Sequence, residues 1–341
     1  MNTKKPVKVL VVDDSIVFRE VLARGISCDP DIIVVAVAKD PFEARDKIIQ
    51  FDPDVMTCDV EMPKMNGIEF IRRLMPQHPI PVIVVSAASN AVFEAMNAGA
   101  VDFVMKPDVR SVISVGNFME EMIEKIKICS LAKVGSLKTS NSAVQMKTSN
   151  PANADRIIAI GASTGGTEAI YKILKCFPGN MPGVVLVQHI PPVFSRMFAE
   201  RLNNSTALRV KEASTGDCLE IGSVLVAPGD RHMMVRRFGG KYKVECFEGE
   251  KVNGHRPSVD ILFESVAKEA GDKAVGIILS GMGYDGAKGL LSMRKRGART
   301  IGQDEGSSVV YGMPKVAFNI GAVEKQAPLE DIPALVQSML G

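Results

Sequence analysis

Three polar residues that follow apolar runs carry the chemistry that this sequence suggests. Ser163 follows the run 157–160 within a G-x-S-x-G pattern, His189 follows 184–188, and Asp285 follows 275–279 after a glycine-rich turn. A serine hydroxyl becomes a good nucleophile when a neutral imidazole accepts its proton and a carboxylate orients that imidazole. These residue types predict acyl transfer if parallel strands bring their ends to one edge of a sheet.

The glycine-flanked turn around Ser163 favours this chemistry without deciding it. The apolar, β-branched run before the turn predicts a buried strand, and residues 167–177 have helical character. A strand, a tight turn and a helix would expose the hydroxyl above the sheet and aim free N–H groups at the same point. The same arrangement also binds phosphate, so the turn alone leaves both interpretations open. In the second glycine-rich turn, the amide of Met282 is a candidate oxyanion donor.

A second set of polar residues ends apolar runs in the first third of the chain: Asp13 and Asp14, Asp59, Ser86 and Lys106. Three converging carboxylates repel one another unless a cation is present, and hard oxygen ligands suit Mg²⁺. A hydroxyl and an ammonium beside such a cluster would stabilise a phosphoryl group on a carboxylate. The two neighbouring aspartates could instead cap the following helix, but capping does not account for the polar residues at the other strand ends.

Alternating strand-like and helix-like segments supply the elements that would position both sets. The first domain has predicted strands at 7–12, 33–38, 55–58, 82–86 and 102–105, with helices at 15–27, 41–50 and 67–75. They predict a flavodoxin-like (βα)5 fold with a doubly wound parallel sheet in the order 2-1-3-4-5. The second domain is predicted to be a Rossmann-like, doubly wound α/β fold with a β-hairpin over 235–247.

The pattern divides the chain into a first domain over residues 1–128, a connector over 129–154 and a second domain over 155–341. The connector is rich in Ser, Thr, Asn and Lys and has no aromatic residue, which predicts a flexible linker. A flexible linker would let one domain rest on the other and leave it. A passive spacer has the same composition.

Composition and charge argue against several classes of protein. The formal net charge is only +2, which disfavours an electrostatic nucleic-acid binder. No apolar run has the length of a membrane span, and Lys8 interrupts the first apolar stretch, so we expect no secretion signal. The six cysteines are scattered without a C-x-x-C pair. We therefore expect reduced thiols and a cytoplasmic protein. None of the four histidines forms a His-x-x-x-His pair, so we expect no zinc site.

The first domain resembles the receiver domain of two-component response regulators over nearly its whole length. The matching motifs are Val11-Val12-Asp13-Asp14-Ser15, the run 59–67, Ser86-Ala87 and Lys106-Pro107. The resemblance implies that a histidine kinase phosphorylates Asp59, with Mg²⁺ held by Asp13, Asp14 and Asp59.

The same resemblance implies roles for the residues around the phosphorylation site. Ser86 and Lys106 would sense the phosphoryl group. Phe103 occupies the position of the family's switch aromatic, although it could equally be a core residue. Lys106–Pro107 is a candidate cis peptide bond.

The second domain resembles the catalytic domain of the chemotaxis receptor methylesterases, the CheB family. The matching motifs occur in the family's order: Gly161-Ala162-Ser163-Thr164-Gly165-Gly166, Gln188-His189-Ile190, the run 255–260 and the run 281–286. The resemblance implies hydrolysis of glutamate γ-methyl esters on chemoreceptors and deamidation of receptor glutamines. Ser163 would be the nucleophile, His189 the general base and then acid, and Asp285 the residue that orients His189.

Four further residues receive roles from this resemblance. The Met282 amide would bind the oxyanion, and Thr164 would assist it. His255 and Arg256 are expected at the substrate cleft, with His255 either a structural residue or a substrate contact.

These expectations describe a phosphorylation-activated methylesterase and glutaminase whose unphosphorylated receiver inhibits the catalytic domain. Phosphorylation would need Mg²⁺, and the esterase reaction would need no cofactor. The expected partners are methyl-accepting chemotaxis receptors and a chemotaxis histidine kinase, with no nucleic acid and no membrane insertion.

The alternative is a non-enzymatic response regulator whose glycine-rich second domain binds a nucleotide or a protein partner. Such a regulator has no need for His189 and Asp285. A third possibility is an esterase for small-molecule esters.

Overall fold

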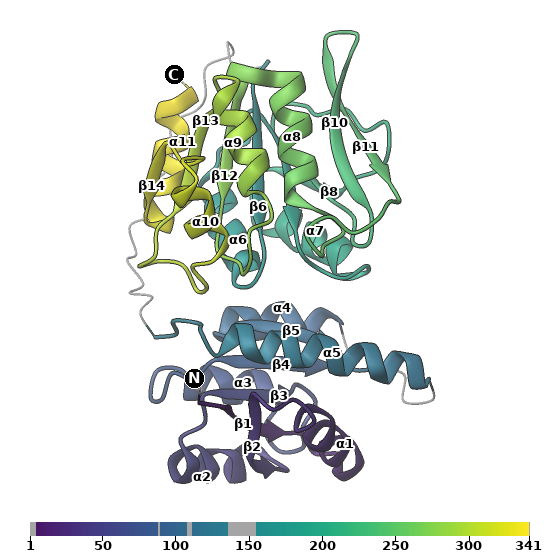
Figure 1. Cartoon of the computed structure of the whole chain (residues 1–341), viewed down its shortest axis with the longest axis vertical. Helices are drawn as coiled ribbons and strands as arrows, with labels where there is room; N and C mark the ends of the chain where they lie inside the picture. The colour runs from purple at the N-terminus through teal and green to yellow at the C-terminus, as the bar shows by residue number, and fades with distance from the viewer. Residues whose placement is uncertain (1–4, 88, 108–110, 136–154, 341) are drawn as a thin grey trace. The chain divides into compact units, whose positions relative to one another are not determined.

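The computed structural model describes residues 5–87, 89–107, 111–135 and 155–340 (Figure 1). The chain separates into two compact units, Met1–Lys138 and Thr139–Gly341. Most of the expected connector, residues 136–154, lies outside the described residues, so the boundaries at 128 and 155 stay a prediction. Within the described ranges, no helix combines the length and the apolar character that a membrane crossing requires.

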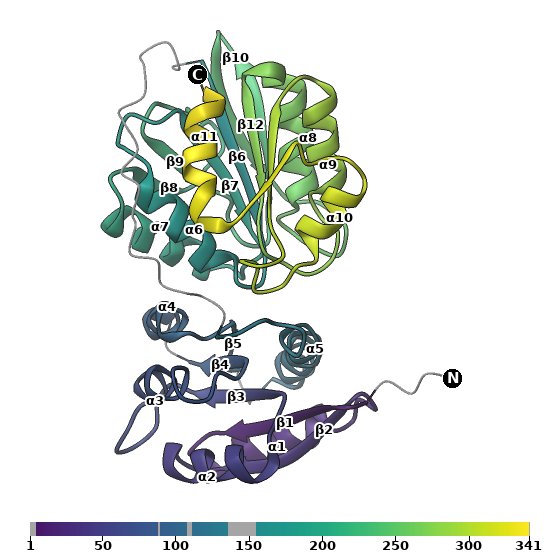
Figure 2. The ribbon, with the colours of Figure 1, turned by 90° about the vertical axis from the view of Figure 1, so that its left-hand side faces the viewer.

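The first unit is a five-stranded parallel sheet in the order β2-β1-β3-β4-β5, which confirms the predicted fold and order. The strands are β1 (Val7–Val12), β2 (Ile32–Ala38), β3 (Val55–Asp59), β4 (Val82–Ser86) and β5 (Asp102–Met105). The helices are α1 (Ile16–Ile26), α2 (Pro41–Phe51), α3 (Gly67–Leu74), α4 (Ser89–Ala98) and α5 (Val112–Cys129). Helices α3 and α4 lie on one face and α5 on the other (Figure 2).

Side-chain caps fix where several of these helices begin. Ser15 Oγ accepts a hydrogen bond from the Phe18 amide at α1, and Asp40 accepts one from the Glu43 amide at α2. Asn66 caps α3 in the same way. These oxygens replace the intrahelical acceptors that first-turn amides lack. The loops after β1, β2 and β3 therefore turn into helix at defined residues.

The second unit is a seven-stranded parallel sheet in the order β14-β13-β12-β6-β7-β9-β8. Its strands are β6 (Ile157–Ala162), β7 (Gly183–Gln188), β8 (Arg209–Glu212), β9 (Ser223–Val226), β12 (Ala274–Ile278), β13 (Arg299–Gln303) and β14 (Lys325–Ala327). Its helices are α6 (Gly166–Cys176), α7 (Phe194–Ser205), α8 (Val259–Ala270), α9 (Ala287–Lys295), α10 (Met313–Asn319) and α11 (Ile332–Leu340). Helices α6, α7 and α11 cover one face and α8, α9 and α10 the other (Figure 2).

Strand β6 stands at the centre of this sheet. The chain fills one side of β6 with β7, β8 and β9 and then returns to fill the other side with β12, β13 and β14. The reversal between β6 and β12 is a topological switch point, at whose carboxyl edge open α/β sheets bind their ligands. The doubly wound prediction is confirmed, and the ends of β7 and β12 flank the end of β6.

An antiparallel hairpin, β10 (His232–Phe238) and β11 (Lys241–Phe247), forms a separate two-stranded sheet. Its turn is Gly239-Gly240, with φ of +57° and +80°, which confirms the predicted hairpin. Buried hairpin residues, among them Val235 and Val244, belong to the same hydrophobic core as α8. The hairpin therefore extends the main core.

Candidate active site

Ser163 lies in a tight turn between β6 and α6 that backbone hydrogen bonds hold from both sides. Its amide donates to Ser280 O at 3.0 Å, and its carbonyl accepts from the Gly166 amide at 2.7 Å and from Gln188 Nε2 at 2.9 Å. Gly165, with φ of +75°, makes the sharp turn into the helix. The predicted strand–turn–helix around a half-buried serine is therefore present.

Two glycines near Ser163 occupy positions that have no room for a side chain. A Cβ atom on Gly281 would lie 2.7 Å from Ser163 Cβ, and one on Gly161 would lie 2.2 Å from Val259 Cγ1. The glycines after β12 and in β6 thus let two loops and the start of α8 meet around the serine.

His189 and Asp285 form a buried hydrogen-bonded pair. His189 Nε2 lies 2.9 Å from Asp285 Oδ2, and the His189 amide donates to Ala162 O at 3.1 Å, which fixes His189 beside the end of β6. His189 Nδ1 is buried without a hydrogen-bond partner among the described residues. With Nε2–H donating to the carboxylate, Nδ1 is the nitrogen that can accept a proton.

The Ser163 hydroxyl itself makes no hydrogen bond to any residue within the described ranges. The sheet brings the ends of β6, β7 and β12 together, and the His189–Asp285 bond is formed, whereas a Ser163–His189 bond is not. Catalytic hydrogen bonds are often long without substrate and tighten in the complex.

Asp285 accepts five hydrogen bonds, so its carboxylate is fully engaged. Besides His189, the donors are Asn253 Nδ2 (2.8 Å), Ser258 Oγ (2.8 Å) and the amides of Val259 (2.7 Å) and Asp260 (3.2 Å). Burial alone would raise the pKa of Asp285, but the bond to His189 and the other donors outweigh burial and hold that pKa below its usual range. Asp285 is therefore ionised and can hold His189 in one tautomer.

Two of these donors come from the N-terminus of α8, which Asp285 caps from a distant part of the chain. Ser258, the residue before α8, makes no capping bond with its own helix and donates to Asp285 instead. The positive end of the helix dipole further favours the ionised carboxylate. Sequence reasoning assigned no role to Ser258, which lies within the motif at 255–260, and missed Asn253, for which the available signal was its closeness to that motif.

His255 lies flat against His189. The ring centroids are 3.8 Å apart and the planes differ by 14°. Burial and, to a smaller extent, the nearby His189 lower the pKa of His255 to about 4. His255 is therefore neutral at neutral pH and covers one face of the His189 ring.

This lowered pKa predicts an acid-sensitive stability. Between pH 6.5 and 4 the unfolded chain binds a proton at residue 255 that the folded chain does not, so stability is present above pH 6.5 and falls as the pH falls. We expect His255→Phe to remove about 2 kcal/mol of the stability loss between pH 7 and pH 5. Hydrogen exchange of the β6 and β12 amides at both pH values measures this loss of stability. An unchanged pH dependence in the variant would contradict the assignment.

The glycine-rich turn after β12 is tied to the turn after β6. Ser280 Oγ donates to Thr164 O at 2.8 Å, and the Met313 amide donates to Gly281 O at 2.7 Å. Within the described part of the chain, the Met282 amide has no acceptor, and Thr164 is buried. Their expected oxyanion roles stay predictions, with the Met282 N–H available for such a role.

Arg256 points its guanidinium at another side chain. Its Nε donates to Asp230 Oδ1 at 2.9 Å and its Nη1 to Gly249 O, so these contacts occupy the arginine that we expected at the substrate cleft.

The prediction of a cis peptide bond at Lys106–Pro107 is wrong. Among the described residues, the cis peptide bond is Arg256–Pro257.

In the first unit, the structure brings the predicted carboxylates together. Oxygens of Asp13, Asp14 and Asp59 lie within 4.8 Å of one another, a donor set that suits a hard divalent cation. Asp13 and Asp59 are buried, and Lys106 Nζ lies 2.8 and 2.7 Å from their oxygens. Burial raises the pKa of Asp13 against the opposing effect of Lys106, and the two aspartates raise the pKa of Lys106 despite its burial.

Ser86 and Phe103 lie at the expected strand positions. Ser86 is buried at the end of β4, and its carbonyl accepts from the Lys106 amide at 3.1 Å. Phe103 is buried in β5, edge-on to Phe93, with Lys125 Nζ above its ring. This inward position fits a core residue, and the switch role stays a prediction.

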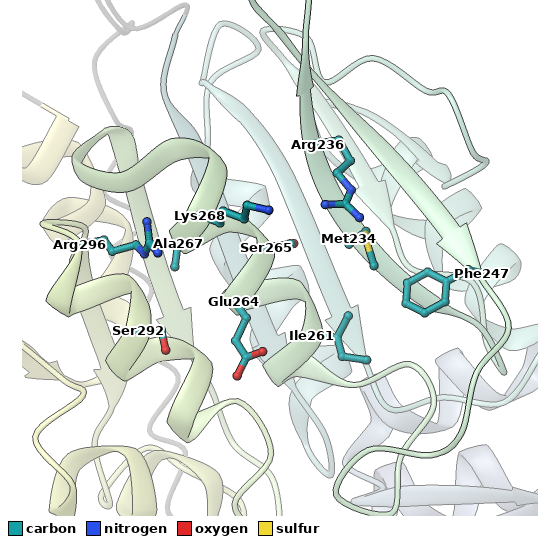
Figure 3. Close-up of a pocket in the computed structure, with 10 residues that line it drawn as sticks. All are labelled: Met234, Arg236, Phe247, Ile261, Glu264, Ser265, Ala267, Lys268, Ser292 and Arg296. Atoms are coloured by element: carbon teal, nitrogen blue, oxygen red, sulfur yellow. The ribbon is translucent and has the colours of Figure 1, made fainter.

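A groove of about 510 Å³ runs between the hairpin and helices α8 and α9 (Figure 3). Its lining mixes the apolar Phe247 and Ile261 with the charged Arg236, Glu264 and Lys268. Arg236 is paired with Glu245 within the hairpin, and the Val235 amide donates to Ser265 Oγ, which attaches the hairpin to α8. None of the predicted site residues lines the groove.

Comparison with known proteins places both units in families. The CheB methylesterase family matches residues 158–336, and the response regulator receiver domain matches residues 9–114. Protein-glutamate methylesterase/protein-glutamine glutaminase 2 of Syntrophomonas wolfei is 59% identical over 326 residues, covering 96% of this chain and 95% of that protein. The enzyme of that name from Syntrophotalea carbinolica is 48% identical over 98% of each chain.

Among solved structures, the CheB methylesterase catalytic domain of Thermotoga maritima aligns with a TM-score of 0.53 and 36% identity, covering 54% of this chain and 98% of that one. The family matches include the segments that hold Ser163, His189, Asp285 and Asp59. The chain belongs to the CheB methylesterase family, with a response regulator receiver domain ahead of its methylesterase domain.

Proposed function

We propose that this protein is a phosphorylation-activated protein-glutamate methylesterase and protein-glutamine glutaminase with Ser163, His189 and Asp285 as its triad. The observation that supports the triad best is the buried hydrogen bond between His189 Nε2 and Asp285 Oδ2 beside the strand end that carries Ser163. The two activities are those in the names of relatives that match nearly the whole chain. Those names disfavour the alternative of a non-enzymatic regulator.

In the proposed reaction, Ser163 Oγ attacks the γ-carbonyl carbon of a glutamyl methyl ester while its proton passes to His189 Nδ1. The bond to the methoxy oxygen breaks, His189 returns the proton to this leaving group, and methanol departs from a glutamyl ester of Ser163. Water then attacks this ester with His189 as base, which releases glutamate and restores the serine. A glutamine side chain would react in the same steps and release ammonia.

Asp285 and the oxyanion donors stabilise the charges that form in these steps. The ionised carboxylate balances the imidazolium of His189. The Met282 amide is the candidate donor to the negative oxygen, with Thr164 beside it, and one such donor typically contributes about 10²- to 10³-fold in kcat.

In the receiver domain, Asp59 would accept the phosphoryl group from a chemotaxis histidine kinase. Asp13, Asp14 and Asp59 would hold Mg²⁺, which neutralises charge on the transferring group when bound. Lys106 and Ser86 would contact the phosphoryl oxygens, and Phe103 would report the change to the domain surface.

We further propose that the unphosphorylated receiver domain keeps substrate from the catalytic domain. Phosphorylation would then act by a population shift toward an open form, and the gain in rate is limited by how completely the closed form excludes substrate. The proposed substrates are the cytoplasmic helices of methyl-accepting chemotaxis receptors, which also places the enzyme in the cytoplasm.

A small phosphodonor with Mg²⁺ is expected to raise methanol release from methylated receptor membranes, and Asp59→Asn is expected to abolish that increase. The reason is that an amide cannot accept the phosphoryl group, while the triad stays intact. Residues 155–341 alone should be more active than the unphosphorylated chain and insensitive to the phosphodonor. If this fragment were no faster than the unphosphorylated chain, inhibition by the receiver domain would be wrong.

A further inference from the structure

A four-residue turn just before α8 touches two members of the proposed triad. Val252 and His255 exchange both backbone hydrogen bonds, each 3.0 Å long. The residues between them, Asn253 and Gly254, have φ of +54° and +82°. Positive φ at both central residues defines a type I′ turn, for which Asn-Gly is a preferred pair. The local sequence therefore specifies this turn.

Two side chains of this turn reach the catalytic residues. Asn253 Nδ2 donates 2.8 Å hydrogen bonds to Asp285 Oδ1 and to Asp260 Oδ2. His255 stacks on His189, as described above. Each side chain thus contacts a different member of the His189–Asp285 pair.

We propose that the 252–255 turn is a positioning element of the active site, in which Asn253 fixes the carboxylate of Asp285 and His255 fixes the ring plane of His189. This inference rests on the proposed triad. The Nε2–Oδ2 hydrogen bond holds one edge of the imidazole but leaves the ring able to rotate about that bond. A parallel ring against one face removes this freedom, so Nδ1 keeps the direction in which it receives the proton.

The neutral state of His255 suits this role. The groups that influence its charge are His189, Asp285 and Lys251, and burial acts in the same direction as His189 and Lys251. A neutral neighbour does not repel the imidazolium that forms on His189 during the reaction. A permanently positive residue here would raise the energy of that intermediate state.

Kinetics of the full chain, activated by a phosphodonor on methylated receptor membranes, separate positioning from substrate binding. For His255→Ala we expect kcat for methanol release to fall about 10- to 100-fold with KM within about twofold of wild type. His255→Phe keeps a flat ring and should recover most of kcat. A raised KM at unchanged kcat would make His255 a substrate contact and overturn the proposal, as would a His255→Phe enzyme as slow as His255→Ala.

A fluorophosphonate probe tests the same point without the receptor, because Ser163 Oγ displaces fluoride from it. Labelling should slow in His255→Ala in parallel with kcat. Unchanged labelling in His255→Ala, with none in Ser163→Ala, would overturn only the role of the turn. Labelling that persists in Ser163→Ala would contradict the triad itself.

Asn253 allows a matched pair of variants, since Asp and Gly both tolerate its left-handed backbone. Asn253→Gly removes the side chain, whereas Asn253→Asp places a third carboxylate between Asp260 and Asp285. We expect kcat to fall about 10-fold in the first and about 100-fold in the second, with KM unchanged. Circular dichroism checks that both Asn253 variants fold. Wild-type kcat in both folded variants would overturn the proposal.

Discussion

Ser163→Ala is expected to lower kcat for methanol release by about 10⁶-fold, to near the background rate. The substitution removes the only atom that forms the proposed acyl-enzyme bond. The hydroxyl makes no hydrogen bond within the described residues and is half-buried, so its loss should change the free energy of unfolding by only about 0.5 kcal/mol. The variant should therefore lose its activity while it keeps nearly the stability of the wild type.

The measurement is methanol release from methylated receptor membranes, with phosphodonor and Mg²⁺ present. Ser338→Ala is a matched control, because Ser338 is an exposed helical serine whose hydroxyl donates to the backbone carbonyl of Leu335. It should leave the rate unchanged. If Ser163→Ala kept substantial activity, the triad would be removed from the mechanism, and the glycine-rich turn after β6 would become a binding loop.

Most of what could be predicted from the sequence follows from the polar residues at the ends of apolar strands. Most of the proposed functional residues close or directly follow a buried apolar strand, and parallel strands must present their carboxyl ends at one edge. This reasoning predicts that Asp13 lies near Asp59 in the receiver domain and that Ser163 lies near His189 in the second domain, in agreement with the carboxylate cluster and with the bond from the His189 amide to Ala162 O. The apolar runs also indicate the strands that carry these residues.

The contacts that orient the proposed catalytic residues could not be predicted in the same way. Asp285 precedes a helix, where an aspartate usually caps that helix, yet it receives the amides of α8, which begins 26 positions earlier in the chain. Tertiary packing brings this partner to Asp285, so no local sequence pattern indicates it. Edge strands β8 and β14 escaped prediction because they are short and polar, with the sequences RVKE and KQA.

Asp285→Asn is expected to lower kcat by about 10⁴-fold and, unlike Ser163→Ala, to destabilise the catalytic domain. Five donors converge on the carboxylate, and an amide offers only one oxygen to accept them. Its NH₂ group would replace either Oδ2, which accepts from His189 and the Val259 amide, or Oδ1, which accepts from Asn253, Ser258 and the Asp260 amide. The first arrangement selects the wrong tautomer of His189, and either arrangement leaves a buried N–H group of α8 unsatisfied, at about 1–3 kcal/mol.

Kinetics and hydrogen exchange on the same sample test both effects. Asp272→Asn, at an aspartate outside the triad, serves as the control for the charge change. The decisive comparison is between activity and fold: if Asp285→Asn weakened the protection of α8 but kept more than about a tenth of kcat, Asp285 would be a structural cap alone. If kcat fell by the expected factor while α8 stayed fully protected, the expected destabilisation would be wrong, because Oδ2 accepts from both His189 and the Val259 amide while Oδ1 accepts from the Asp260 amide.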